Sequence, residues 1–175
     1  MSQESLKSAL EKTICGIQGK PSCSNVVFRA ETEWVEDVRC NVKIREFGPM
    51  CVDEPESLGG TNTAPNPVEL VLAALGTCQE IMYSAYASVM GIKLKRLKVD
   101  VKGYLDLKGL FAMDETVPAG FKKIVYETTI ESDAARESLQ KLVQMVESHC
   151  PVYDTLSRPV EVKGAVTING AKMAA

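Results

Sequence analysis

Apolar residues recur along the chain at two different periods, which separate predicted strands from predicted helices. Where every second residue is apolar, the pattern is typical of half-buried strands. Where apolar residues lie three and four positions apart, it predicts amphipathic helices. The strand-like segments are 25–47, 95–105, 121–131 and 159–169. The predicted helices are 3–17, 66–90, about 133–148 and a single turn at 151–157.

The most apolar segment predicts a helix with clear signals at both ends. Asn66 suits the N-cap, Pro67 suits the first helical position, and Glu69 falls in capping-box register. Gly91 ends the helix. Because this helix is apolar nearly all round, we expect it to be central and buried. Charged and amide residues interrupt the apolar run, so it does not predict a membrane span.

The order of elements predicts an α+β fold, because strands come in antiparallel-looking runs and not in βαβ alternation. We expect antiparallel sheets wrapped around the long central helix. That helix is too apolar for the surface of a small monomer, so we expect an intertwined homodimer to cover it. Residues 1–20 are predicted to form a helical extension, and residues 21–175 a single domain.

Charge and composition exclude several classes of partner. The 175 residues carry 20 basic and 23 acidic side chains, a net charge of −3, without a long run of one sign. Such a balance gives no strong field toward nucleic acid or an anionic membrane. The first residues lack the basic and apolar regions of a secretory signal. We therefore expect a cytoplasmic protein that binds neither nucleic acid nor membranes.

Six cysteines are the main candidates for chemistry. None forms a C-x-x-C pair and the chain has one histidine, which does not fit a usual zinc site. In a reducing compartment we expect free thiols. Cys78 lies within the apolar helix, where a packed core cysteine is the plainer interpretation. Cys150 precedes Pro151, so it either ends one helix or caps the next, where the helix dipole would favour its thiolate.

Two segments together resemble the OsmC/Ohr family. NPVELVLAALGTC at 66–78 is similar to the helix carrying the first cysteine of that family, and HCPVYDTL at 149–156 is similar to the turn carrying the second. PAGFKKI at 118–124 is similar to the strand entry between them. The two cysteines lie 72 positions apart, in the family's order, and the resemblance extends over about residues 25–169.

The resemblance implies thiol-dependent reduction of organic or inorganic hydroperoxides in an intertwined homodimer, as a defence against oxidative stress. Cys78 then matches the cysteine that attacks the peroxide, and Cys150 the one that resolves the sulfenic acid as a disulfide. An external thiol would restore both cysteines, and no cofactor or metal is expected.

The sequence departs from the family pattern at one position. The family's catalytic glutamate directly follows NP, where this chain has Val68; Glu69 comes one residue later, on the side of the helix away from Cys78, and is expected to cap the helix. The family's arginine is expected on the early strands, with Arg39 favoured over Arg29 and Arg45. An alternative is a non-enzymatic protein that holds a small hydrophobic ligand in its dimer cleft.

Overall fold

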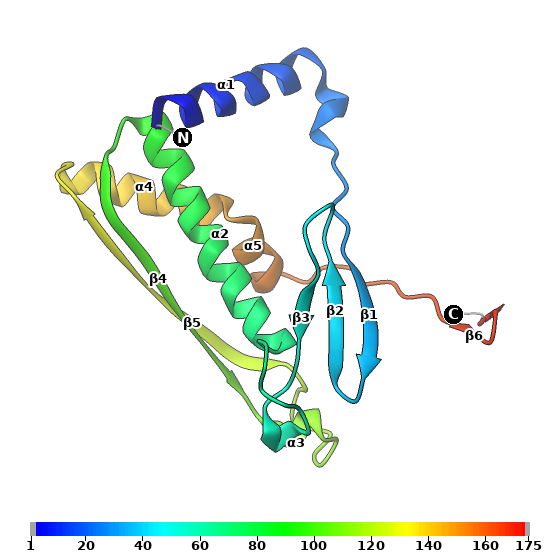
Figure 1. Cartoon of the computed structure of the whole chain (residues 1–175). Coiled ribbons are helices and arrows are strands. Elements are labelled where there is room, and N and C mark those ends of the chain that lie inside the picture. Colours follow the sequence, from blue (N-terminus) through cyan, green and yellow to red (C-terminus); the bar gives the residue numbers. More distant parts are fainter. Residues whose placement is uncertain (1–2, 174–175) are drawn as a thin grey trace.

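The computed structural model describes residues 3–173 as an α+β fold, as predicted, organised around one long helix (Figure 1). The longer helices are α1 (Gln3–Gly19), α2 (Pro67–Met90) and α4 (Arg136–His149). The shorter ones are α3 (Leu107–Leu110) and α5 (Pro151–Ser157), with 3-10 turns η1 (Pro21–Ser24) and η2 (Glu56–Leu58). The strands are β1 (Glu31–Glu36), β2 (Arg39–Lys43), β3 (Met50–Val52), β4 (Leu94–Leu105), β5 (Phe121–Ser132), β6 (Thr167–Ile168) and β7 (Ala171–Lys172).

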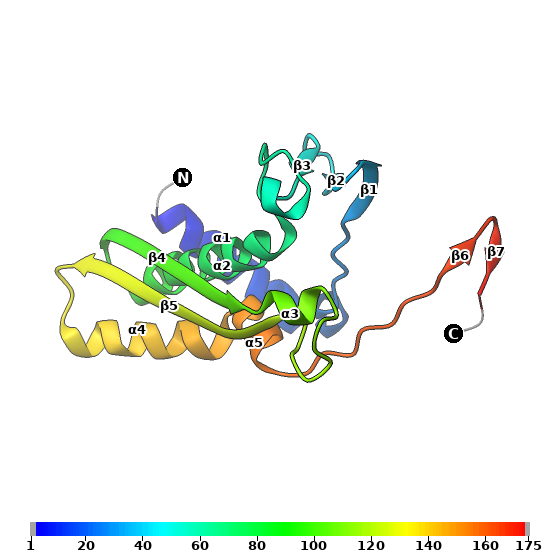
Figure 2. The ribbon, with the colours of Figure 1, turned by 90° about the horizontal axis from the view of Figure 1, so that it is seen from below.

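The strands form three separate antiparallel sheets within the described chain. β1, β2 and β3 make a small meander, β4 and β5 make a long hairpin, and β6 and β7 pair over two residues each. The meander lies near the N-terminal end of α2, while α2 and α4 cover the hairpin (Figures 1 and 2). The N-terminal end of α2 therefore lies near the meander, and its C-terminal end leads into β4 of the hairpin.

The predicted signals set the ends of α2. Asn66 accepts the Glu69 backbone N–H at 2.9 Å, and the Glu69 carboxylate accepts the Asn66 backbone N–H at 2.9 Å, so the capping box is confirmed. Pro67 opens the helix, and Gly91 closes it in the left-handed conformation with φ of 68°. The N-terminal bonds fix where α2 starts and thus the position of every residue along it.

The core lies between α2, α4 and the inner face of the β4–β5 hairpin. Its buried centre combines Tyr83 and Ala87 of α2 with Leu142 and Val146 of α4. Leu97 and Ile130, facing residues on the hairpin, pack against this centre. The alternating pattern of residues 95–105 and the three- and four-residue spacing of α4 are thereby confirmed, because both place their apolar residues toward one core.

The close approach of α2 to β4 depends on one glycine. A Cβ on Gly76 would lie 3.3 Å from the Val101 side chain and 3.8 Å from the Val99 carbonyl oxygen. Glu80, one turn later, accepts the Val99 backbone N–H at 3.1 Å. The small side chain therefore lets α2 lie directly on the strand, and Glu80 satisfies a donor on the strand's free edge.

Two expectations about burial and strands differ from the structure. α2 is not buried all round within one chain: Ile81, at its middle, is 67% exposed, and Val68 and Val71 are also exposed. Residues 159–166 form no strand, and Val160 and Val162 on this stretch are exposed. Both segments carry the apolar residues that the sequence pattern identified, but no described element of the same chain covers these exposed side chains. The predicted division of the chain at residue 20 stays a prediction.

Candidate redox site

Cys78 and Cys150 lie in direct contact although 72 positions separate them in the sequence. Cys78 is on α2, Cys150 lies at the joint between α4 and α5, and their sulfur atoms are 3.4 Å apart. A disulfide has a sulfur–sulfur distance of about 2.05 Å, so these are two free thiols in contact. Cys150 is fully buried, whereas Cys78 is half-buried. A small molecule from solvent therefore reaches Cys78 more readily than Cys150.

Backbone hydrogen bonds on both sides hold Cys150 in place. Its N–H donates to the Val146 carbonyl oxygen at 2.9 Å and ends α4, while its own carbonyl oxygen accepts the Asp154 N–H at 2.9 Å. Pro151 then opens α5. Cys150 thus caps two helices at once, which joins the two alternatives left open by the sequence: it both ends one helix and begins the next.

The first turn of α5 presents a backbone N–H group to Cys78. The Cys150 side chain makes no capping hydrogen bond, and the expectation that the dipole of this helix favours its thiolate stays a prediction. The backbone N–H of Val152 instead donates to the Cys78 sulfur. The residue immediately after Pro151 points this donor across to α2, an arrangement that requires the tertiary fold and not only the helix start.

Electrostatics within one chain favour the protonated form of Cys78. Burial raises the pKa of the Cys78 thiol, the N–H of Val152 lowers it in part, and the neighbouring Cys150 raises it again. The net direction is upward. An additional positive charge would be needed to turn Cys78 into a strong nucleophile, because the thiolate is the reactive form.

A buried polar residue next to Cys78 was not among the candidates predicted from the sequence. The side chain of Gln79 is 1% exposed, and its amide nitrogen and oxygen have no well-aligned hydrogen bond among the described residues. The amide approaches the Tyr126 hydroxyl, which also donates to a Glu147 carboxylate oxygen at 3.3 Å. Burial, together with Glu147, raises the pKa of Tyr126 to about 12. The sequence offered one signal for Gln79, an amide side chain within an apolar helix. Such a side chain is rarely buried without a hydrogen-bond partner or a function.

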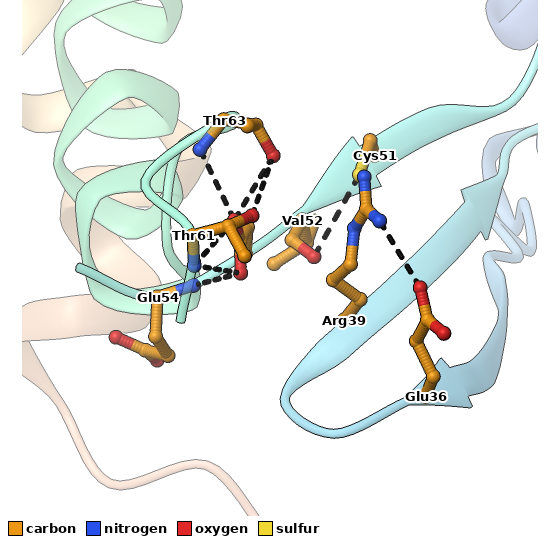
Figure 3. Close-up of polar contacts among 8 residues, drawn as sticks. Glu36, Arg39, Cys51, Val52, Glu54, Thr61 and Thr63 are labelled. Atoms are coloured by element: carbon orange, nitrogen blue, oxygen red, sulfur yellow. Dashed lines mark hydrogen bonds and ion pairs between the residues drawn. The ribbon is translucent and has the colours of Figure 1, made fainter. Parts of the chain in front are cut away.

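The structure places Arg39 on the small β1–β2–β3 sheet, whereas Cys78 lies on α2 and Cys150 at the joint between α4 and α5. Arg39 lies on β2, and its guanidinium group lies beside the Cys51 thiol and 3.2 Å from a Glu36 carboxylate oxygen (Figure 3). Its hydrogen bonds with Cys51 and Glu36 raise the pKa of Arg39. Neither sulfur of the Cys78–Cys150 pair is among the described partners of Arg39, so its role at that pair stays a prediction.

The rival arginines have other surroundings. Arg45 has φ of 53°, and its guanidinium carbon lies 4.5 Å from the centre of the Phe47 ring. Arg29 lies in the exposed segment before β1. His149 is exposed and bonds to the carbonyl oxygen of Met145 at 2.9 Å, and neither sulfur is among its described contacts.

A buried carboxylate shapes the loop that leads into α2. Asp53 is fully buried and accepts backbone N–H groups of Glu54, Thr61 and Thr63 and both threonine hydroxyls, at 2.7–3.3 Å (Figure 3). The Thr61 hydroxyl and the Thr63 N–H hold the pKa of Asp53 well below its usual range. At Gly60 a Cβ would lie 1.8 Å from the Glu54 carbonyl oxygen, so the loop can close only with glycine there.

Neither a cluster of metal ligands nor a membrane-spanning helix is found within residues 3–173. No group of three or more His, Cys, Asp or Glu side chains in this range could hold a metal ion. None of the helices described there combines the length and the hydropathy needed to cross a membrane.

Comparisons with known proteins agree with this fold. The sequence profile of the family described as OsmC-like protein matches residues 60–164, which include both cysteines. The uncharacterized protein YmaD of Bacillus subtilis is 25% identical over 115 residues, covering 62% of this chain and 71% of YmaD.

Two solved structures share the fold at low identity. The OsmC-like protein of Mycoplasma pneumoniae has a TM-score of 0.65 at 18% identity, covering 75% of this chain and 88% of its own. The organic hydroperoxide resistance protein OsmC of Legionella pneumophila has a TM-score of 0.58 at 20% identity, covering 76% and 92%. Because the profile spans more than half of the sequence and the fold agrees, the chain belongs to the family of OsmC-like proteins.

Proposed function

We propose that this protein reduces hydroperoxides with Cys78 as the attacking and Cys150 as the resolving cysteine. The observation that carries the proposal is the 3.4 Å contact between their sulfur atoms. The Legionella protein of the same fold, an organic hydroperoxide resistance protein, supports the same class of substrate. A reducing compartment such as the cytoplasm suits this chemistry, because the cycle consumes thiols.

The reaction needs two steps at sulfur and one regeneration. The Cys78 thiolate attacks one peroxide oxygen and the O–O bond breaks, which leaves a sulfenic acid on Cys78. The other oxygen leaves with the bonding electron pair, takes a proton from solvent and departs as an alcohol, or as water from hydrogen peroxide. The Cys150 thiolate then attacks that sulfur, and water leaves as the disulfide forms. Two external thiols reduce the disulfide by exchange and become a disulfide themselves.

In this proposal, a second copy of the chain supplies the cation that one copy lacks near Cys78. Burial raises the pKa of Cys78, so a cation must lie near it for the thiolate to form at neutral pH. In the intertwined homodimer, Arg39 of one copy would approach Cys78 of the other. The exposed Ile81 on α2 supports a dimer, because a large apolar side chain at the middle of an apolar helix calls for a cover.

The mechanism can be tested by adding cumene hydroperoxide to the reduced protein and locating disulfides by mass spectrometry. We expect a Cys78–Cys150 disulfide in the wild type and none in Cys150→Ser, where the sulfenic acid accumulates. Cys23→Ser removes an exposed thiol and is the matched control, with unchanged peroxide consumption. If Cys78→Ser consumes peroxide as fast as wild type, the mechanism is wrong.

The arginine is tested separately, by comparing Arg39→Lys with Arg29→Lys and Arg45→Lys in peroxide consumption. A lysine keeps the charge but loses the planar fork of donors. We expect only Arg39→Lys to slow the first step. Equal loss in all three variants, or loss only in a rival, would remove Arg39 from the site.

The second candidate function is a non-enzymatic protein that binds a small hydrophobic ligand in the dimer cleft. Two observations favour it: Val68 stands at the family's glutamate position, and burial raises the pKa of Cys78. The rate of Cys78 alkylation as a function of pH separates the two functions. A Cys78 pKa clearly below the free value of about 8.5 in the native protein supports the peroxidase, and one at or above it supports binding.

A further inference from the structure

One tyrosine of the hairpin contacts all three helices that position the two cysteines. Tyr126 lies on β5, opposite Val101 of β4. Its hydroxyl donates to a Glu147 carboxylate oxygen of α4 at 3.3 Å, and the Gln79 amide of α2 approaches the same hydroxyl. Its ring meets that of Tyr153 on α5 edge to face, with ring centres 6.2 Å apart. A single side chain therefore connects α2, α4 and α5.

Each of these contacts lies close to the Cys78–Cys150 pair along the chain. Gln79 directly follows Cys78, and Glu147 lies three residues before Cys150, near the end of α4. Tyr153 directly follows the residue whose backbone N–H donates to the Cys78 sulfur. Because packed elements transmit displacements to their neighbours, contacts at these three places limit how far the two sulfur atoms can separate.

The buried amide of Gln79 indicates that this arrangement serves more than stability. The Gln79 side chain is 1% exposed, and within residues 3–173 neither of its amide atoms has a well-aligned hydrogen bond. Such a group lowers stability relative to an apolar side chain of the same shape. The Tyr126 hydroxyl donates its proton to Glu147, so its oxygen can still accept an N–H of this amide. Buried polar groups that lower stability are typical of functional sites.

We propose that Tyr126 is a positioning residue that holds the Cys78 and Cys150 sulfur atoms at the distance from which they form a disulfide. Its hydroxyl bridges α2 and α4, so the reduced pair has little freedom left to lose when the bond forms. The proposal rests on the proposed function for its place in catalysis and deepens it, since it gives the resolving step a residue that does not itself react. Without the bridge the two thiols separate more often, and the disulfide becomes less favourable relative to the reduced pair.

A redox titration tests this role without peroxide. The reduced protein is equilibrated with mixtures of reduced and oxidised dithiothreitol, and mass spectrometry after alkylation gives the fraction of Cys78–Cys150 disulfide. The two protein thiols are oxidised as the dithiothreitol disulfide is reduced. Tyr126→Phe removes the hydroxyl and keeps the ring against Tyr153, and its equilibrium constant for disulfide formation should fall by about two- to fivefold. Tyr104→Phe, an exposed tyrosine of the same hairpin, is the control and should match the wild type.

Gln79→Met separates positioning from stability. Methionine has nearly the shape of glutamine but no amide, so the urea midpoint of the reduced protein should stay unchanged or rise. The equilibrium constant for disulfide formation should nevertheless fall by about two- to fivefold, because the contact of α2 with the Tyr126 hydroxyl is lost. A residue with only a structural role would move both measurements in the same direction. This variant also keeps the proposal testable if Tyr126→Phe does not fold.

In the peroxide assay, Tyr126→Phe should differ from the wild type in the second step only. After addition of cumene hydroperoxide, dimedone traps the sulfenic acid on Cys78. We expect the sulfenic acid to form at the wild-type rate and to persist about two- to fivefold longer, because its reaction with Cys150 is slower.

The proposal is overturned by a wild type that forms no Cys78–Cys150 disulfide at any dithiothreitol ratio, or by an unchanged equilibrium constant in folded Tyr126→Phe. A shift in Tyr126→Phe without one in Gln79→Met would overturn the assignment of Gln79 as the partner on α2. The titration contains no peroxide, so its result is distinct from that of the proposed function. A protein that consumes no peroxide but shows the expected shifts loses the proposed function and keeps the role of Tyr126.

Discussion

Oxidation of the Cys78–Cys150 pair should raise the free energy of unfolding by closing a long loop. The crosslink would join residues 72 positions apart. For a loop of about 70 residues, the chain-entropy relation predicts a loss of about 15 cal/mol/K in the unfolded chain, or about 4.4 kcal/mol at 25 °C. The sulfurs must also approach from 3.4 Å to about 2.05 Å, and the strain of that movement lowers the gain. We therefore expect a net gain of about 2–4 kcal/mol.

Urea unfolding measures this gain at one fixed protein concentration, with reduced and oxidised samples side by side. With a urea slope of about 2 kcal/mol/M, the midpoint should rise by about 1–2 M on oxidation. Cys78→Ser should show no rise, whereas Cys23→Ser should behave as the wild type. Mass spectrometry of the oxidised sample establishes that the bond is present.

An unchanged or lower midpoint in a sample with the verified disulfide would refute the reasoning. It would mean that the bonded pair requires a distorted fold, and that the contact between the free thiols does not represent the geometry of the oxidised protein. A rise that persists in Cys78→Ser would assign the effect to another thiol.

Three further changes test the fold around the site. Asp53→Asn should lower the free energy of unfolding, and Glu56→Gln on the same loop is its control. Because the folded-state pKa of Asp53 is lowered, the contribution of Asp53 to stability is complete above about pH 4 and is lost as the pH falls through the folded value. Urea titrations at several pH values measure this dependence. Leu142→Ala, in the core, should cost about 2–5 kcal/mol of unfolding free energy, and Met145→Ala on the exposed side of α4 less than about 0.5 kcal/mol. Asn66→Ala should cost about 1 kcal/mol in the same assay through loss of the capping box.

Local signals in the sequence were sufficient for elements whose ends are set by neighbouring residues. The two ends of α2 were predicted correctly from Asn66, Pro67, Glu69 and Gly91, because capping involves residues only a few positions apart. The contact of Cys78 with Cys150 was predicted through the family resemblance, since no local pattern relates residues so far apart.

Features that depend on the direction of a group in space could not be predicted from the sequence. The start of α5 was correctly located, but whether its N–H groups face Cys150 or Cys78 depends on how α5 packs against α2. The neighbourhood of Arg39 and Cys51 depends on the register of β2 and β3, which places Asn41 opposite Cys51 and Arg39 on the same face. Residues 159–166 carry a strand pattern, but a strand also requires a neighbouring edge, which the pattern cannot specify.

The short helix α5 makes the redox state of the protein visible in its backbone. A helix of seven residues is too short to be stable by itself, so its hydrogen bonds persist only while its neighbours hold it in place. A bond between Cys150 and Cys78 would attach the first turn of α5 covalently to α2. Amide hydrogen exchange in α5 should then slow on oxidation, while exchange at exposed Val162 stays fast. The exchange rates of the α5 amides thus report whether Cys78 and Cys150 are reduced or bonded to each other.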